Sequence, residues 1–240
     1  MDFLTELHSL TGHFEADIRS TDLSKSTAAL RWSGLDLVAH LGEVHRWAAE
    51  VVRTGHRAGR ENVPQLDGDP TEWYSRSRGE LLDLLDRTDP AKPVWTHQRS
   101  QRTARYWHRR QTHETLVHLW DLRSVTDASA AAPAEASPAL WVDTVDELFE
   151  VFATKRAEQE GVSLPAPLRI IATDHRRTWT IHPDFSCEPV AVGRRGAAVT
   201  GTAGDLALFA WGRLAPASDR LRVDGDASVV DVFRRARIRP

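Results

Sequence analysis

The chain has 240 residues, of which 41% are hydrophobic and 27% are charged, a composition typical of an ordinary globular protein and not of a disordered or collagenous one. Its formal charge is −3, from 31 Lys and Arg against 34 Asp and Glu, so it lacks the basic excess of nucleic-acid-binding proteins. Apolar stretches are short, and the first residues carry acids where a signal peptide needs bases. We therefore expect a cytoplasmic protein that binds neither nucleic acid nor membrane.

Helical periodicity dominates the first two thirds of the chain. Ser33, followed by Asp36, resembles a capping box, and Asp69 before Pro70 is a second helix start. A stretch of small residues, 126–138, has the composition of a linker. The predicted helices cover about residues 3–14, 35–54, 70–85, 103–125 and 140–157.

The pattern changes after Pro165-Ala-Pro167 to short β-rich runs bounded by Asp, Gly and Pro. A helix capped by Thr202 and a closing helix at 228–235 lie among these runs. We therefore predict an α-helical bundle over residues 1–158 and a small α+β domain over residues 165–240. The predicted strands are residues 168–173, 178–182, 190–192, 197–200 and 221–223.

The fourth predicted helix carries a polar stripe. Gln111, Glu114, His118 and Asp121 are spaced by three or four residues, so they share one helix face, while leucines and a tryptophan occupy the others. If this helix is central in a bundle, the stripe points into the interior or a cleft. Buried polar groups must be paired or bound to a metal.

Glu114 and His118 offer a carboxylate oxygen and an imidazole nitrogen one helical turn apart, a spacing that suits zinc or another divalent ion. His40, on the second predicted helix, is the candidate third ligand. The competing interpretation is a set of ordinary surface pairs, because a chain with 11 histidines shows this spacing by chance. His45 and His113 are interpreted as packing or surface histidines.

Cys187 is the single cysteine, so the chain forms no internal disulfide and has no CxxC motif. Any thiol chemistry therefore needs a thiol from a separate molecule. A run of arginines ahead of the polar stripe is interpreted as a solvated helix face: Arg99, Arg102, Arg105, Arg109 and Arg110.

Four segments, in this order, carry a resemblance to a known family: LVAHL (37–41), HETLVHLWD (113–121), TGTAGDLALFAWGR (200–213) and VDGD (223–226). Together they resemble the mycothiol-dependent maleylpyruvate isomerase family over nearly the whole chain. The resemblance implies a DinB-like four-helix metal-binding bundle, followed by a smaller domain similar to sterol carrier proteins.

The resemblance also implies zinc ligation by His40, Glu114 and His118, and mycothiol as the thiol cosubstrate. A metal-bound thiol ionises, and the thiolate adds to a small electrophile such as maleylpyruvate. In an isomerase the former double bond, now a single bond, rotates before the thiol is eliminated. An S-transferase keeps the thiol adduct as its product. Arg213 is the candidate for binding a carboxylate, with a helix-end cation as the alternative, and Asp121 is the candidate for orienting an imidazole.

Two other functions remain open from the sequence. A metal-dependent hydrolase would use zinc-bound water in place of a thiolate. A non-catalytic protein would hold a small ligand in the second domain. We expect a monomer or a homodimer.

Overall fold

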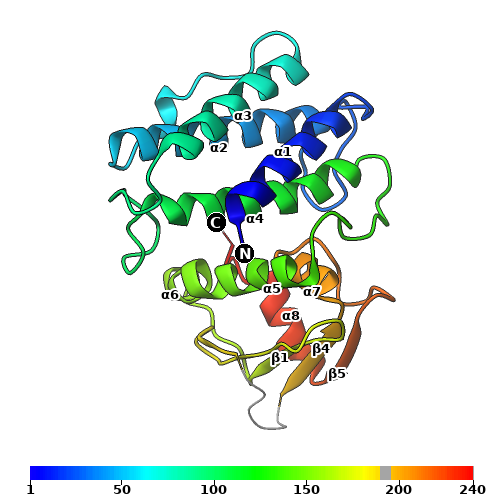
Figure 1. The fold of residues 1–240 in the computed structure, drawn as a ribbon. Helices are drawn as coiled ribbons and strands as arrows, with labels where there is room; N and C mark the ends of the chain where they lie inside the picture. The colour runs from blue at the N-terminus through cyan, green and yellow to red at the C-terminus, as the bar shows by residue number, and fades with distance from the viewer. Residues whose placement is uncertain (190–195, 240) are drawn as a thin grey trace. The chain divides into compact units, whose positions relative to one another are not determined.

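The computed structural model describes residues 1–189 and 196–239. The chain divides into two compact units, Met1–Glu135 and Ala136–Pro240, drawn in Figure 1. The first unit is helical, and the second contains a β-sheet with helices. The predicted order, helices first and a mixed α+β region second, is confirmed.

The first unit is built from four long helices, α1 (Phe3–Ile18), α2 (Gly34–Thr54), α3 (Pro70–Arg87) and α4 (Ala104–Arg123). Their starts follow from local sequence: Ser33 and Asp36 form a full capping box, and the Asp69 side chain accepts from the Glu72 N–H. A short 3-10 turn, η1 (Arg60–Asn62), lies between α2 and α3. Helices α1 and α2 each pack against both α3 and α4.

Helices α2 and α3 approach each other closely at Gly42. A Cβ atom at this position would lie 1.9 Å from the Trp73 ring, so only glycine fits without displacing the indole. The Trp73 ring is held in turn by a hydrogen bond from its Nε1 to the Gln65 carbonyl. This contact fixes the position of α2, the helix that carries His40.

Helix α4 is buried along most of its length, including its polar residues. Gln111, His113 and Asp121 are each at most 1% exposed, and His118 is 5% exposed. The polar stripe predicted from the sequence therefore lies inside the helical unit. Polar groups in such a place need partners, and those partners define the site described below.

The second unit contains a five-stranded sheet in the order β3-β2-β1-β4-β5. The central pair β1–β4 is parallel, and the other neighbours are antiparallel. The sequence missed the short β3, and the strand predicted at 190–192 lies outside the described residues. The strands are β1 (Leu168–Ala172), β2 (Thr178–Ile181), β3 (Cys187–Glu188), β4 (Ala197–Gly201) and β5 (Arg222–Gly225).

A long helical segment opens the second unit. It comprises α5 (Pro138–Glu147), a π-helical stretch η2 (Leu148–Ala153) and α6 (Thr154–Glu160). The unit is completed by α7 (Ala203–Ala210) and α8 (Ala227–Arg235). No helix within residues 1–189 and 196–239 is long and apolar enough to cross a membrane.

The division between the units falls at Glu135, earlier than the boundary at 158–165 expected from the sequence. The reason is that α5 packs on α7. The Trp211 indole donates to the Thr144 carbonyl at 3.0 Å, and Trp179 on β2 donates to Asp146 at 2.6 Å. The change from helix to strand therefore marks a change of secondary structure within one unit, not a unit boundary.

Candidate metal centre

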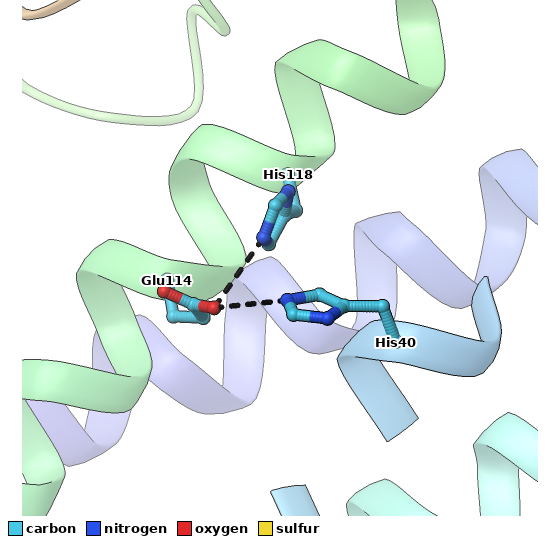
Figure 2. Close-up of side chains that lie close together, drawn as sticks. All are labelled: His40, Glu114 and His118. Carbon is cyan, nitrogen blue, oxygen red and sulfur yellow. Dashed lines mark hydrogen bonds and ion pairs between the residues drawn. The ribbon is translucent and has the colours of Figure 1, made fainter. Parts of the chain in front are cut away.

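Helices α2 and α4 bring His40, Glu114 and His118 together, as Figure 2 shows. The Nε2 atoms of His40 and His118 each lie 3.4 Å from Glu114 Oε1. One ligand atom from each of the three residues lies within 4.8 Å of the other two. The three candidate ligands proposed from the sequence thus form one cluster in the structure.

Asp121 fixes the tautomer of the His118 ring. Its Oδ2 lies 2.9 Å from His118 Nδ1, and because a carboxylate only accepts, Nδ1 carries the hydrogen. In the neutral ring, Nε2 then holds a lone pair that faces the Glu114 carboxylate. Two electron-rich atoms in this arrangement favour a cation between them.

The spacing of these atoms fits a divalent ion. Two ligands at the usual zinc distances of about 2.0–2.1 Å in a tetrahedral site lie roughly 3.3 Å apart. The two nitrogen–oxygen separations here are both 3.4 Å. Two imidazoles and one carboxylate also form the ligand set typical of catalytic zinc sites, which keep one position for water or substrate.

The other oxygen of Glu114 binds an arginine. Arg110 Nη2 donates to Glu114 Oε2 one turn earlier on α4, and the Arg110 side chain is only 6% exposed. The interpretation of the arginine run as a solvated face is therefore wrong for Arg110, because its guanidinium is buried and pairs with the Glu114 carboxylate. It is correct for Arg105, which is exposed on α4, whereas Arg99 and Arg102 are exposed but precede the helix.

Trp32 borders the candidate metal centre. Its ring centroid lies 4.7 Å from that of His40 and 6.3 Å from that of His118. The His40 side chain, 25% exposed, is the most accessible of the three candidate ligands. An indole beside the two imidazoles restricts their rotation, so the site is partly preformed.

A second histidine on α2 has neutral partners. His45 Nδ1 lies 2.9 Å from Gln111 Oε1, and His45 Nε2 lies 3.3 Å from the Tyr74 hydroxyl. Burial lowers the pKa of His45 to about 4, so the ring is neutral, with Nδ1 donating and Nε2 accepting. Gln111, the remaining member of the polar stripe, therefore serves this network.

Two other residues have the environments expected of structural groups. His113 is fully buried and packs edge-on against Phe3, at 5.7 Å between centroids. Arg123, at the end of α4, pairs with Asp17 and Glu135.

Arg213 belongs to the second unit, so it is not among the residues brought together on α2 and α4. It lies just beyond α7, after Trp211 and Gly212, and its Nη1 donates to the Trp211 carbonyl at 2.8 Å. A cation at this place is favoured by the carbonyl groups at the end of the helix. The contact agrees with the helix-end alternative, and the binding of a carboxylate by Arg213 stays a prediction.

Two neighbours of the centre, Arg110 and Trp32, were not assigned to it from the sequence. Arg110 had a signal, because it stands four residues before Glu114 and shares its helix face. Trp32 had none, because it precedes α2 in a stretch without periodicity. Only the folded chain shows that its ring reaches His40.

Comparisons with known proteins agree with this architecture. Residues 4–123 match the family model described as the mycothiol maleylpyruvate isomerase N-terminal domain. The chain belongs to this family. Residues 139–231 match the MDMPI C-terminal domain, which agrees with a second unit that starts near residue 136. As a member of this family, the chain is an isomerase-type enzyme.

Two crystal structures share the fold: the mycothiol-dependent maleylpyruvate isomerase and a point mutant of it. Each matches with a TM-score of 0.62 and 16% identity, covering 92% of this chain and 91% of the other. No curated protein matches the sequence significantly.

Proposed function

We propose that this chain is a metal-dependent enzyme that activates mycothiol for isomerisation of a small electrophile such as maleylpyruvate, or for S-transfer to it. The observation that carries the proposal is the convergence of His40, Glu114 and His118 on one point. Family membership supports mycothiol as the thiol. Zinc, or another divalent ion, would be held by these three residues and would supply the positive charge that keeps a thiol ionised at neutral pH.

The surrounding residues have distinct tasks in this proposal. Asp121 holds the His118 ring in the form that offers Nε2 as a ligand. Arg213 binds a carboxylate of the substrate, because a planar guanidinium matches a planar carboxylate with two hydrogen bonds. The helices α1–α4 correspond to the DinB-like four-helix bundle, and the second unit corresponds to the sterol-carrier-like domain.

The protein's own cysteine does not replace the cosubstrate thiol. Burial raises the pKa of the Cys187 thiol to about 12, so almost none of it is thiolate at neutral pH. The thiolate is the nucleophilic form of a thiol. A thiol-dependent reaction at neutral pH therefore uses a separate thiol. We propose that the enzyme acts in the cytoplasm as a monomer or homodimer.

The experiment is metal analysis of the purified full-length chain, followed by titration of the same sample with mycothiol. We expect about one zinc or other divalent ion per chain and saturable binding of mycothiol. Removal of the ion with a chelator should abolish mycothiol binding, and added zinc should restore it.

Other outcomes would change the assignment. If the protein holds an ion but does not bind mycothiol, the proposed function becomes that of a hydrolase that uses metal-activated water. Neither ion nor thiol binding, even after zinc is added, would leave a non-catalytic ligand-binding protein.

A further inference from the structure

The candidate metal centre contains the partly buried carboxylate of Glu114, the buried carboxylate of Asp121 and one buried cation. Glu114 faces both histidines, and Asp121, which is fully buried, contacts His118. Arg110 is the cation, and it contacts the Glu114 oxygen Oε2. Three charged groups this close together in a buried place influence any further charge strongly, because solvent screens them little.

The contact with Arg110 gives the two oxygens of the Glu114 carboxylate different partners. Oε2 accepts from the guanidinium, whereas Oε1 faces both Nε2 atoms. Arg110 and Glu114 lie one turn apart on α4, so the helix itself sets their separation. Arg110 thereby leaves Oε1 as the Glu114 oxygen that would be offered to a bound ion.

The net charge of the centre depends on Arg110. With neutral imidazoles, these three residues together carry −1, from −2 for Glu114 and Asp121 and +1 for Arg110. A divalent ion would raise the sum for these groups to +1. Without Arg110 the sum would be one unit lower, so the centre would attract an anion less strongly.

We infer that Arg110 is a positioning residue that makes the metal centre selective for anionic ligands at its open position. This inference rests on the proposed function, in which a divalent ion is held by His40, Glu114 and His118. The ligand class it names is a small anion, of which a thiolate is one. Arg110 acts through its contact with Glu114 and through its charge.

The test uses the full-length protein loaded with Co²⁺, whose visible absorption changes when a fourth ligand binds. Thiocyanate is a probe that stays anionic at all working pH values, and imidazole at pH 8 is a neutral probe. We expect Arg110→Gln to weaken thiocyanate binding roughly tenfold and to change imidazole binding less than about twofold. Arg110→Lys keeps the charge and should restore most of the thiocyanate affinity.

Arg78→Gln is the matched control. Arg78 on α3 pairs with Glu15 on α1, so this variant also removes a partly buried arginine–glutamate pair, but not one that involves a metal ligand. It should leave the affinities for both probes unchanged. If Arg110→Gln fails to fold, Arg110→Met replaces it, because an apolar side chain of similar length can fill the buried position.

The inference is overturned if Arg110→Gln binds thiocyanate as tightly as the wild type, or if both probes weaken equally. Equal weakening would mean that Arg110 supports the fold of the centre and not its charge. Failure of the wild type to bind Co²⁺ or Zn²⁺ would instead overturn the proposed function, and this inference with it.

Discussion

Two histidines on α2, five residues apart, both face α4 and differ completely in their partners. His45 bonds to Gln111 and Tyr74, which are neutral. His40 lies beside Glu114 and His118, with Asp121 behind His118. The first group is a closed hydrogen-bond network, and the second gathers acceptor atoms and charge.

The difference in partners explains how the same pair of helices can hold a structural histidine and a candidate metal ligand. Each ring nitrogen of His45 has a complementary partner, so nothing further is needed to satisfy it. At His118 the lone pair on Nε2 faces a carboxylate, an arrangement that a cation completes. The chemical type of the partner, rather than burial of the histidine, separates the two roles.

Replacing one histidine in each group should give the largest difference between variants in metal affinity and stability. In His118→Ala we expect the affinity for zinc to fall by about a thousandfold or more, with loss of activity, because one of three ligands is gone. The helices should survive, as measured by far-ultraviolet circular dichroism. In His45→Ala we expect the metal to be kept and the protein to be destabilised by about 3 kcal/mol, because Gln111 and Tyr74 lose their partner.

Metal content and urea unfolding of both variants measure this contrast. Zinc retained at wild-type affinity in His118→Ala would remove that residue from the ligand set. Loss of zinc in a folded His45→Ala would show that the two groups are not separate.

Acid should destabilise the protein through His45. Burial lowers its pKa to about 4 in the folded chain, against 6.5 in the unfolded chain. Between these values only the unfolded chain takes up the proton, so the free energy of unfolding should fall by about 3 kcal/mol as the pH drops from 6.5 to 4. Above pH 6.5 the ring is neutral in both states and this contribution is constant.

The measurement is urea unfolding of metal-free protein from pH 7.5 to pH 4, for the wild type and His45→Gln. Other histidines titrate in both proteins, so the difference between the two curves isolates His45. Parallel curves over this range would show that the buried ring takes up a proton without cost.

The contact between Asp121 and His118 should have a smaller effect on the metal. In Asp121→Asn we expect zinc affinity to fall by roughly 10–100-fold, because residues that orient a ligating imidazole have effects of this size. Competition with a chromophoric chelator measures the affinity. An unchanged value would mean that α4 alone holds the His118 ring in place.

The smallest expected effect is at Tyr74. In Tyr74→Phe, His45 Nε2 loses its donor, and we expect a destabilisation of about 1 kcal/mol with unchanged zinc affinity. Thermal unfolding and chelator competition on one sample measure both. A change in zinc affinity would show that the two histidine groups communicate along α2.

The sequence predicted much of the first unit because its signals are local. The capping box at Ser33, the Asp69-Pro70 start and the polar stripe of α4 all lie within a few residues of the features they specify. The spacing of Glu114 and His118 is also set by one helix. His40 was assignable because α2 carries an apolar face that had to pack against neighbouring helices.

The features that the sequence did not predict depend on contacts between distant segments. The division at Glu135 follows from the packing of Thr144 against Trp211, which are 67 residues apart. The two-residue strand β3 exists because Cys187 and Glu188 pair with β2. Arg110 is buried only because α4 is surrounded by other helices, a fact that its helix position alone does not contain.

The place of Trp32 gives the protein an optical reporter of its own. An indole 4.7 Å from the His40 ring should lose fluorescence when a paramagnetic ion such as Co²⁺ binds between the histidines, and lose less with Zn²⁺. The chain has nine tryptophans, and Trp32→Phe identifies the share of the emission that comes from this one. Occupancy of the centre can then be followed in real time, without any label, during loading, chelation and turnover.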